Sequence, residues 1–144
     1  MRLGILTGGG DAPGLNAVIR ATVRAAMRHH GWPPVLGIPQ GFKGLVERLD
    51  PIELTPYTTR GLINRGGTIL HTTNRSNPFQ YPVGDDGYED RSDTVMERIE
   101  ELGIDALIIL GGDGSLSIAH RLAAKGARVI GAPKTIDNDV KGTE

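Results

Sequence analysis

The sequence predicts an α/β fold of three layers, in which helices cover both faces of a mostly parallel sheet. Short apolar runs alternate along the chain with stretches whose apolar residues recur at helical spacing. Hydrophobic residues make up 38% of the chain but aromatic residues only 4%, so the core is expected to be aliphatic, as in helix-covered parallel sheets. The 21 glycines of the 144 residues are concentrated in loops that follow the apolar runs.

The first predicted elements lie between residues 3 and 44. The short apolar run at residues 3–7 predicts a buried strand, and the glycine-rich loop at 8–14 opens a helix. That helix is expected over residues 15–31, ending at a glycine before a Trp-Pro-Pro sequence. Residues 35–38 predict a second strand, and residues 40–44 a glycine-rich turn.

The remaining predicted elements follow a long irregular stretch at residues 50–90. This stretch is rich in Pro, Gly, Thr and Asn, and its length favours a binding role over a simple connection. A helix is then predicted over residues 92–103, a buried strand at 106–110, a second helix at 116–125 and a last strand at 128–132. Helices between parallel strands place the loops after the strands at one edge of the sheet.

Whole-chain properties narrow the class of protein. A length of 144 residues fits one domain, and no repeat or domain linker is visible. The formal net charge of −1 gives no overall field that would recruit nucleic acid or an anionic membrane. The absence of cysteine excludes disulfides and thiolate metal sites within this sequence. With no signal peptide and no apolar run long enough to span a bilayer, we expect a soluble cytoplasmic protein.

Three loops combine glycine or proline with carboxylates, and each follows a predicted strand: residues 8–14, 111–115 and 133–139. Glycine lets backbone N–H groups approach phosphate oxygens, and a helix that starts just after the loop adds the positive end of its dipole. Carboxylates repel phosphate unless a divalent cation lies between them, or unless one of them takes a proton from an attacking hydroxyl. The three loops together therefore indicate a site for polyphosphate and a metal ion.

Each loop has a simpler interpretation. Residues 8–14 fit a tight strand-to-helix turn, and they match neither common phosphate-binding pattern: Leu15 and Asn16 replace the Lys-Ser/Thr of the P-loop, and Pro13 replaces the last glycine of the dinucleotide fingerprint. Residues 111–115 could form a hairpin turn, but their place between a strand and a helix favours binding. Asn and Asp favour turns, which is the structural alternative for residues 135–139.

The second and third loops carry the candidate chemical groups. Asp113 is the expected carboxylate toward Mg²⁺, directly or through water, while Gly112 and Gly114 leave room for phosphate and nucleotide. Ser115 is a candidate helix N-cap that can also contact phosphate. A carboxylate of the third loop, beside a cation and a phosphoryl donor, is placed to accept the proton of an attacking hydroxyl.

The residues 9–16 (GGDAPGLN), 111–115 (GGDGS) and 135–139 (TIDND), in that order, resemble the amino-terminal half of 6-phosphofructokinases of the phosphofructokinase A type. Residues 64–68 (NRGGT) fit the same family, and the resemblance covers nearly the whole chain. It implies that donor phosphates and nucleotide are contacted by Gly9, Arg75, Ser76, Gly112, Asp113, Gly114 and Ser115.

The resemblance also implies the reaction. Thr135, Ile136 and Asp137 match substrate-contacting positions, with Asp137 as the proton acceptor and Asp139 supporting the charge and metal geometry. The implied reaction is the Mg²⁺-dependent transfer of the γ-phosphoryl group of ATP to the 1-hydroxyl of fructose 6-phosphate, giving fructose 1,6-bisphosphate in glycolysis. By analogy with the family, the enzyme is an allosteric homotetramer that involves neither nucleic acid nor membrane.

Two positions bear on the phosphoryl donor. Pyrophosphate-using relatives carry an aspartate where this chain has Gly114, and that side chain occupies nucleotide space, so Gly114 favours ATP. Lys134 points the other way, because the pyrophosphate enzymes have lysine there. A steric block is the stronger effect, so we predict ATP and keep a pyrophosphate-dependent phosphofructokinase as the alternative.

Length is the main departure from the family, whose members are more than twice as long. We expect residues 1–144 to carry the donor side and the base but not the half that grips the sugar phosphate, and to be poorly stable and inactive alone, with apolar surface exposed. Two other classes stay open: a related NAD or lipid kinase with the same GGDG loop, and a nucleotide-binding module without catalysis.

Overall fold

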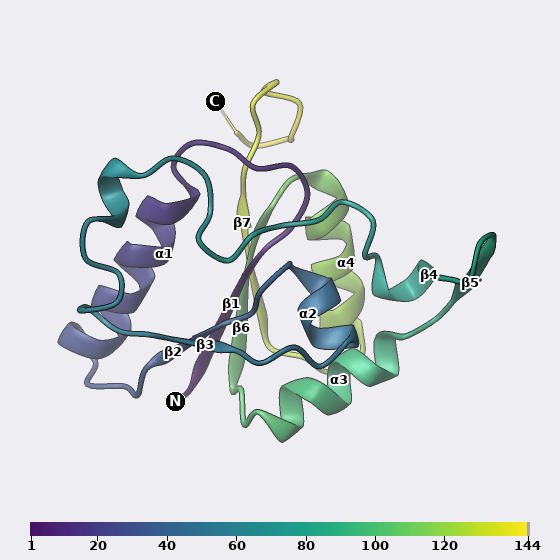
Figure 1. Cartoon of the computed structure of the whole chain (residues 1–144), viewed down its shortest axis with the longest axis horizontal. Helices are drawn as coiled ribbons and strands as arrows, with labels where there is room; N and C mark the ends of the chain where they lie inside the picture. Colours follow the sequence, from purple (N-terminus) through teal and green to yellow (C-terminus); the bar gives the residue numbers. More distant parts are fainter. Residues whose placement is uncertain (144) are drawn as a thin grey trace.

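The computed structural model describes residues 1–143, and its centre is a five-stranded sheet in the order β3-β2-β1-β6-β7 (Figure 1). Four strands are parallel: β1 (Leu3–Thr7), β2 (Val35–Gly37), β6 (Ala106–Gly111) and β7 (Val129–Pro133). The edge strand β3 (Ile52–Leu54) runs antiparallel to β2. The prediction of a mostly parallel sheet is therefore confirmed.

Helices cover the two faces of the sheet, as predicted for three layers (Figure 1). Helix α1 (Leu15–Arg24), which continues as the wider helical turn η1 (Ala25–His29), packs on one face. Helices α2 (Phe42–Val46), α3 (Ser92–Glu101) and α4 (Asp113–Ala124) pack on the other face. The layers follow from the sequence, because each long helix presents one apolar stripe that only a sheet face can bury.

The central strand β1 shows why the core is aliphatic. Ile5 points to the α1 side and Leu6 to the side of the other helices, and both side chains are fully buried. On the α1 side, Ile19 and Val23 of the helix complete the layer. Burial of each such aliphatic side chain contributes on the order of 1.5–3 kcal/mol.

Short elements between residues 40 and 90 were not predicted. The expected turn at residues 40–44 is present at residues 40–41, but helix α2 begins at Phe42. The 50–90 stretch contains β3, the single helical turns η2 (Leu62–Asn64) and η3 (Pro78–Gln80), and a hairpin of β4 (Tyr81–Val83) and β5 (Gly87–Glu89). Each of these elements has three to five residues. Elements this short complete too few periods for a hydrophobic pattern to identify them.

Helix α4 starts earlier than predicted. It begins at Asp113, directly after Gly112 as N-cap, whereas the sequence predicted a start at Leu116. The interpretation of Ser115 as the N-cap is therefore wrong, and Ser115 lies in the first helical turn. The reason is that polar and glycine residues at a helix start give no apolar periodicity, even where the backbone is already helical.

Some apolar surface is exposed on the α1 side of the sheet near β7. Val18, Ile130 and Ile136 are 41%, 58% and 71% exposed. Val18 lines an open pocket together with Ala132 and Ile136, so this flank of α1 faces that pocket and not the core. An exposed apolar surface was expected from the sequence.

The three predicted loops meet at one edge of the sheet, beyond the carboxyl ends of β1, β6 and β7. The Gly8 N–H donates to the carbonyl of Leu110 (2.8 Å), and the Lys134 N–H donates to the carbonyl of Gly111 (2.9 Å). Parallel strands in register thus place the loops side by side, as expected for a ligand site of an open α/β sheet. Within residues 1–143, no helix has the length and the apolar composition that crossing a bilayer demands.

Candidate active site

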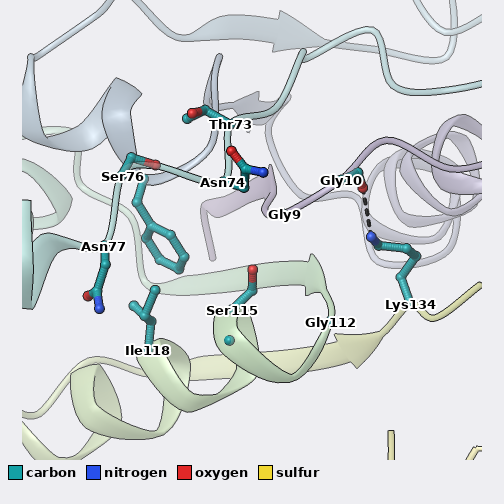
Figure 2. Close-up of a pocket in the computed structure, with 12 residues that line it drawn as sticks. Gly9, Gly10, Thr73, Asn74, Ser76, Asn77, Gly112, Ser115, Ile118 and Lys134 are labelled. Atoms are coloured by element: carbon teal, nitrogen blue, oxygen red, sulfur yellow. Dashed lines mark hydrogen bonds between the residues drawn. The ribbon is translucent and has the colours of Figure 1, made fainter. Parts of the chain in front are cut away.

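A pocket of about 340 Å³ lies at this edge of the sheet (Figure 2). Its walls come from the loop after β1, the first turns of α4, the segment 73–77 and the end of β7. The lining residues are Gly9, Gly10, Phe42, Thr73, Asn74, Ser76, Asn77, Gly112, Gly114, Ser115, Ile118 and Lys134. The structure therefore brings together residues from both glycine-rich loops that the sequence singled out.

Backbone N–H groups on two walls of the pocket are free to bind an anion. Gly9 has a φ of 77°, and within residues 1–143 neither Gly9 nor Gly10 uses its N–H in a hydrogen bond. Opposite them, α4 begins at Gly112 without any side-chain cap, so the first turn offers unpaired N–H groups and the positive end of the helix dipole. Two sets of open donors facing one cavity are what a phosphate chain needs.

The Ser115 side chain leaves no room for a Cβ atom at two glycines around the pocket. Its side chain is buried, with 7% exposure, between the loop after β1 and the end of β6. A Cβ at Gly111 would lie 2.5 Å from the Ser115 Cβ and 2.6 Å from its Oγ, and a Cβ at Gly8 would overlap the same Oγ. Both glycines are therefore required by close packing, while Gly9 and Gly114 face the pocket.

Lys134 places a cation beside the pocket. Its Nζ donates a hydrogen bond to the carbonyl of Gly10 (2.6 Å), which fixes the ammonium group at the mouth of the glycine loop (Figure 2). Lys134 also lines a second pocket of about 420 Å³, together with Thr135 and Ile136. The first pocket, hereafter the donor pocket because the sequence predicts a phosphoryl donor there, thus shares one lysine with the pocket beside the third loop.

Residues that sequence reasoning missed complete the donor pocket. Phe42 and Ile118 give it an apolar wall, while Thr73, Asn74 and Asn77 add polar groups. Phe42 follows β2 at the same sheet edge and Ile118 is one turn beyond Gly114 in α4, so sheet-edge position and helical spacing could have identified them.

Arg75 and Ser76 were predicted as a pair near the nucleotide. The structure places Ser76 in the pocket lining, buried at 4% exposure. Arg75 is exposed and does not line the pocket. Its predicted contact with the nucleotide stays a prediction.

Asp113 is exposed in the first turn of α4, next to Gly112 and Gly114 of the pocket. Among residues 1–143, no three His, Cys, Asp or Glu side chains gather as a metal cluster. Mg²⁺ commonly binds through one or two carboxylates, with phosphate oxygens and water as its other ligands. A single carboxylate beside a phosphate pocket fits that ion, so Asp113 is a suitable ligand in the presence of a phosphate donor.

The third loop lies outside the donor pocket. Asp137 is exposed, and the hydroxyl of Thr135 donates to Asp139 Oδ1 (2.7 Å) while accepting from the Asp139 N–H (3.3 Å). Thr135 and Ile136 line the neighbouring pocket with residues of the loop after β1 and of α1. The residues predicted to contact the acceptor therefore lie outside the donor pocket. Thr135 and Ile136 line a neighbouring pocket, and Lys134 lines both pockets.

The NRGGT segment has a clear structural partner. Asn16 of α1, only 2% exposed, donates through Nδ2 to the carbonyls of Arg65 (3.1 Å) and Gly66 (3.3 Å) and accepts the Ile69 N–H at Oδ1 (2.8 Å). The Asn16 N–H also donates to the Gly67 carbonyl (3.1 Å). This amide thus makes three side-chain hydrogen bonds, which hold residues 65–69 against the helix that follows the first glycine loop.

The fold is that of an α/β protein with a pocket at the carboxyl edge of its sheet, lined by glycine-rich loops. Residues 2–144 match the family described as Phosphofructokinase. The chain therefore belongs to the phosphofructokinase family.

Similar proteins agree with this assignment. The chain is 46% identical over 147 residues to ATP-dependent 6-phosphofructokinase 2 of Clostridium perfringens and 48% identical over 145 residues to ATP-dependent 6-phosphofructokinase 1 of Synechocystis, covering 99% of this chain and 40% of each relative. The crystal structure of Pichia pastoris phosphofructokinase in the T-state superposes with a TM-score of 0.87 at 31% identity, over 99% of this chain and 16% of that one. The chain spans about 40% of the length of the curated relatives it matches.

Proposed function

We propose that this chain provides the phosphoryl-donor side and the catalytic loop of an ATP-dependent 6-phosphofructokinase. The observation that carries the proposal is the donor pocket, where unpaired N–H groups of the loop after β1 face the uncapped start of α4 beside Lys134. The names of relatives that are 46–48% identical support ATP as the donor. The proposal includes a glycolytic role in the cytoplasm and a homotetrameric assembly.

On the donor side, Gly9 and residues 112–115 bind the phosphates of ATP through backbone N–H groups. Ser76, with Arg75, contacts the nucleotide, and Phe42 with Ile118 offers apolar surface to the base. Asp113 holds Mg²⁺ together with the phosphates, and the bound cation supplies charge neutralisation for the transferring group. Lys134 adds a fixed positive charge at the same end of the pocket.

On the acceptor side, Thr135, Ile136 and Asp137 contact fructose 6-phosphate. Asp137 takes the proton of the 1-hydroxyl while that oxygen forms its bond to the γ-phosphorus. The bond from the γ-phosphorus to the bridging oxygen breaks at the same time, and ADP leaves with the electron pair. The products are fructose 1,6-bisphosphate, ADP and the proton carried by Asp137.

The space beside Gly114 supports ATP over pyrophosphate. A Cβ built at Gly114 meets no atom of the described residues within 4 Å, and the backbone there is one that ordinary residues adopt. A side chain at this position would therefore extend into open pocket without disturbing the fold. Lys134 is compatible with either donor, because an ammonium group neutralises the phosphates of both.

The experiment is to measure binding of Mg-ATP and of Mg-pyrophosphate by calorimetry to the chain and to two variants. In Gly114→Asp the introduced carboxylate enters the nucleotide space, so ATP affinity is expected to fall at least 100-fold. Gly114→Ala is the matched control and is expected to stay within about threefold. Equal ATP affinity of Gly114→Asp and the unaltered chain would contradict the assignment of the donor.

The role of Asp137 as the base is tested by enzyme kinetics. This test needs the protein product of the native gene, in a form that phosphorylates fructose 6-phosphate. Intact mass of that product tests the proposal that residues 1–144 are the amino-terminal part of a larger enzyme, with a mass of more than twice 15.4 kDa expected. In that enzyme, Asp137→Asn is expected to lower kcat by a factor of about 100 to 10,000 with little change in the KM for ATP. A kcat within tenfold of the unaltered enzyme would exclude Asp137 as the base.

A second candidate is a nucleotide-binding module without catalysis. It is favoured by the separation of the exposed loop with Asp137 from the donor pocket. Mg-ATP binding without sugar-phosphate turnover, even after mixing with the carboxyl-terminal part of a relative, would support this candidate over the kinase.

A further inference from the structure

Thr72 joins two walls of the donor pocket. Its Oγ1 lies 2.6 Å from the carbonyl oxygen of Gly9 and 3.0 Å from that of Thr7, so its single hydroxyl proton is shared between the two. Gly9 belongs to one wall of the pocket, and the segment 73–77 that follows Thr72 directly forms another wall. The Thr72 hydroxyl therefore connects the loop after β1 to the start of the segment 73–77.

The segment that carries Thr72 is itself held firmly to β1. Thr7 is fully buried, and its hydroxyl donates to the carbonyl of His71 (3.0 Å). Because the one hydroxyl proton of Thr7 goes to His71, the Thr68 hydroxyl, 3.1 Å from Thr7 Oγ1, donates to Thr7, and it accepts the N–H of Leu70 (3.1 Å). Thr72 thus presents its hydroxyl from a backbone that is fixed independently of the pocket.

The position of the Gly9 carbonyl determines the direction of the next N–H. The Gly9 C=O and the Gly10 N–H belong to one planar trans peptide group and point in opposite directions. Because Thr72 holds the carbonyl end, it sets where the Gly10 N–H points, and within residues 1–143 that N–H has no acceptor. Glycine at position 9, with its φ of 77° and no Cβ, would otherwise allow this peptide group many orientations.

We propose that Thr72 is a positioning residue for the phosphoryl donor: its hydroxyl fixes the Gly9–Gly10 peptide group so that the Gly10 N–H is presented to a donor phosphate. This inference rests on the proposed function of the pocket. It adds a residue that touches neither donor nor acceptor, since Thr72 does not line the pocket.

Two substitutions at position 72 separate the hydroxyl from the shape of the side chain. Thr72→Val keeps the volume and removes the bond to the Gly9 carbonyl, whereas Thr72→Ser keeps the hydroxyl. Thr59→Val is the control for the loss of a threonine hydroxyl that bonds a carbonyl: Thr59 is fully buried and donates to the Thr55 carbonyl (2.7 Å) away from the donor pocket, whereas Thr72 is half-buried. A loss of stability alone should therefore be at least as large in Thr59→Val as in Thr72→Val.

The first readout is the affinity for Mg-ATP and Mg-pyrophosphate, measured well below the unfolding temperature of each variant. A hydrogen bond to a charged phosphate corresponds to roughly a 10- to 100-fold change in affinity. Thr72→Val is expected to lose that factor for both donors, while Thr72→Ser and Thr59→Val stay within about threefold. An affinity of Thr72→Val within twofold of the unaltered chain would overturn the inference.

The second readout needs no ligand. The residual dipolar coupling of the Gly10 N–H reports the direction of that bond, and it is expected to change in Thr72→Val but not in Thr72→Ser or Thr59→Val. An unchanged coupling in Thr72→Val overturns the positioning role whether or not a donor binds. Failure of the unaltered chain to bind either donor would instead refute the proposed function, so the two failures are distinguishable.

Discussion

The donor pocket and the loop at residues 134–143 differ in how the chain holds them. Around the donor pocket, buried side chains of Thr7, Asn16 and Ser115 connect the adjoining segments to residues far away in the sequence. In the loop, the side-chain bonds of Thr135 and Thr143 end within the loop itself, on Asp139 and Val140. Its side-chain bond to the rest of the described chain is the one from Lys134 to Gly10.

This difference shows that the two sides of the proposed site are prepared unequally. The donor side has its geometry fixed by packing and buried hydrogen bonds, which are costly to break. The loop with Asp137 has exposed polar groups that water can satisfy equally well, so its internal bonds contribute little to stability. Substitutions of the same chemical kind should therefore have very different effects in the two regions.

The largest contrast is expected from exchanging an amide for a carboxylate in each region. Asn16→Asp places a buried negative charge against the carbonyls of Arg65 and Gly66, and should lower the free energy of unfolding by about 3–5 kcal/mol at neutral pH. Asn138→Asp, at an exposed position with a φ of 55° that Asp tolerates, should stay within about 0.5 kcal/mol.

Urea unfolding at two pH values checks this contrast. Burial among carbonyls raises the pKa of the carboxyl group introduced at position 16. More of this group is therefore protonated, and able to donate a hydrogen bond, at pH 4.5 than at pH 7.5, so the loss of unfolding free energy should be smaller at pH 4.5. Equal losses at positions 16 and 138 would remove the proposed difference between the regions.

The next effect concerns the close packing around Ser115. Gly111→Ala adds a Cβ that meets the Ser115 side chain and lies 3.0 Å from the Gly8 carbonyl, with an expected loss of about 1–3 kcal/mol. Gly114→Ala, three residues further along, enters open space in a helix and should gain up to about 1 kcal/mol. Thermal unfolding of both variants is the measurement, and a stable Gly111→Ala protein would show that the wall of the pocket can shift.

Tyr81 lies outside both regions, and its substitution is expected to have an effect of intermediate size on the free energy of unfolding. The Tyr81 hydroxyl, at 9% residue exposure, donates to Glu47 Oε1 (2.6 Å), and burial together with this bond raises the pKa of the phenol well above its usual value of about 10. Tyr81→Phe should lower the free energy of unfolding by about 0.5–1.5 kcal/mol. Tyr88→Phe, 72% exposed, should change nothing measurable.

The same tyrosine makes stability depend on alkaline pH. Because its folded-state pKa is the higher one, Tyr81 contributes fully below pH 10, and this contribution is lost as the pH rises above 10 and the unfolded phenol ionises first. Denaturant midpoints between pH 8 and 11 should therefore fall more steeply for the unaltered chain than for Tyr81→Phe. Parallel slopes would contradict the raised pKa.

The smallest effect is expected in the loop. Thr135→Val removes the exposed bond to Asp139 and should change the free energy of unfolding by less than about 0.5 kcal/mol. Denaturant unfolding measures this change alongside that of Thr7→Val, which removes the bond from a fully buried threonine to the His71 carbonyl and should cost about 1–3 kcal/mol. A loss above 1 kcal/mol for Thr135→Val would show that the loop is held as firmly as the donor pocket.

Much of the candidate site was predictable from glycine-rich loops placed after apolar runs. Gly9, Gly112, Gly114 and Lys134 line the pocket as their loop positions indicated. The polar wall at Thr73, Asn74 and Asn77 was missed, because irregular segments carry no periodicity that says which way each side chain points.

The sequence by itself determined the central strands, the three-layer class and the edge at which the loops meet. Strands β1, β6 and β7 were predicted to within one residue, since continuous aliphatic runs of this length are stable only when buried in a sheet. Local patterns suffice for these features because they depend on neighbours in the chain.

Only the tertiary structure decided which polar groups support the pocket. Asn16 accepts a hydrogen bond from Ile69, 53 residues away, and Thr72 donates one to Gly9, 63 residues away. No local sequence pattern around Asn16 or Thr72 identifies these partners. The start of α4 and the burial of Ser115 against Gly8 and Gly111 likewise depend on how β1 and β6 lie together. Hydrogen bonds and close contacts between distant segments exist only once the sheet has brought the segments together, so they cannot be read from local periodicity.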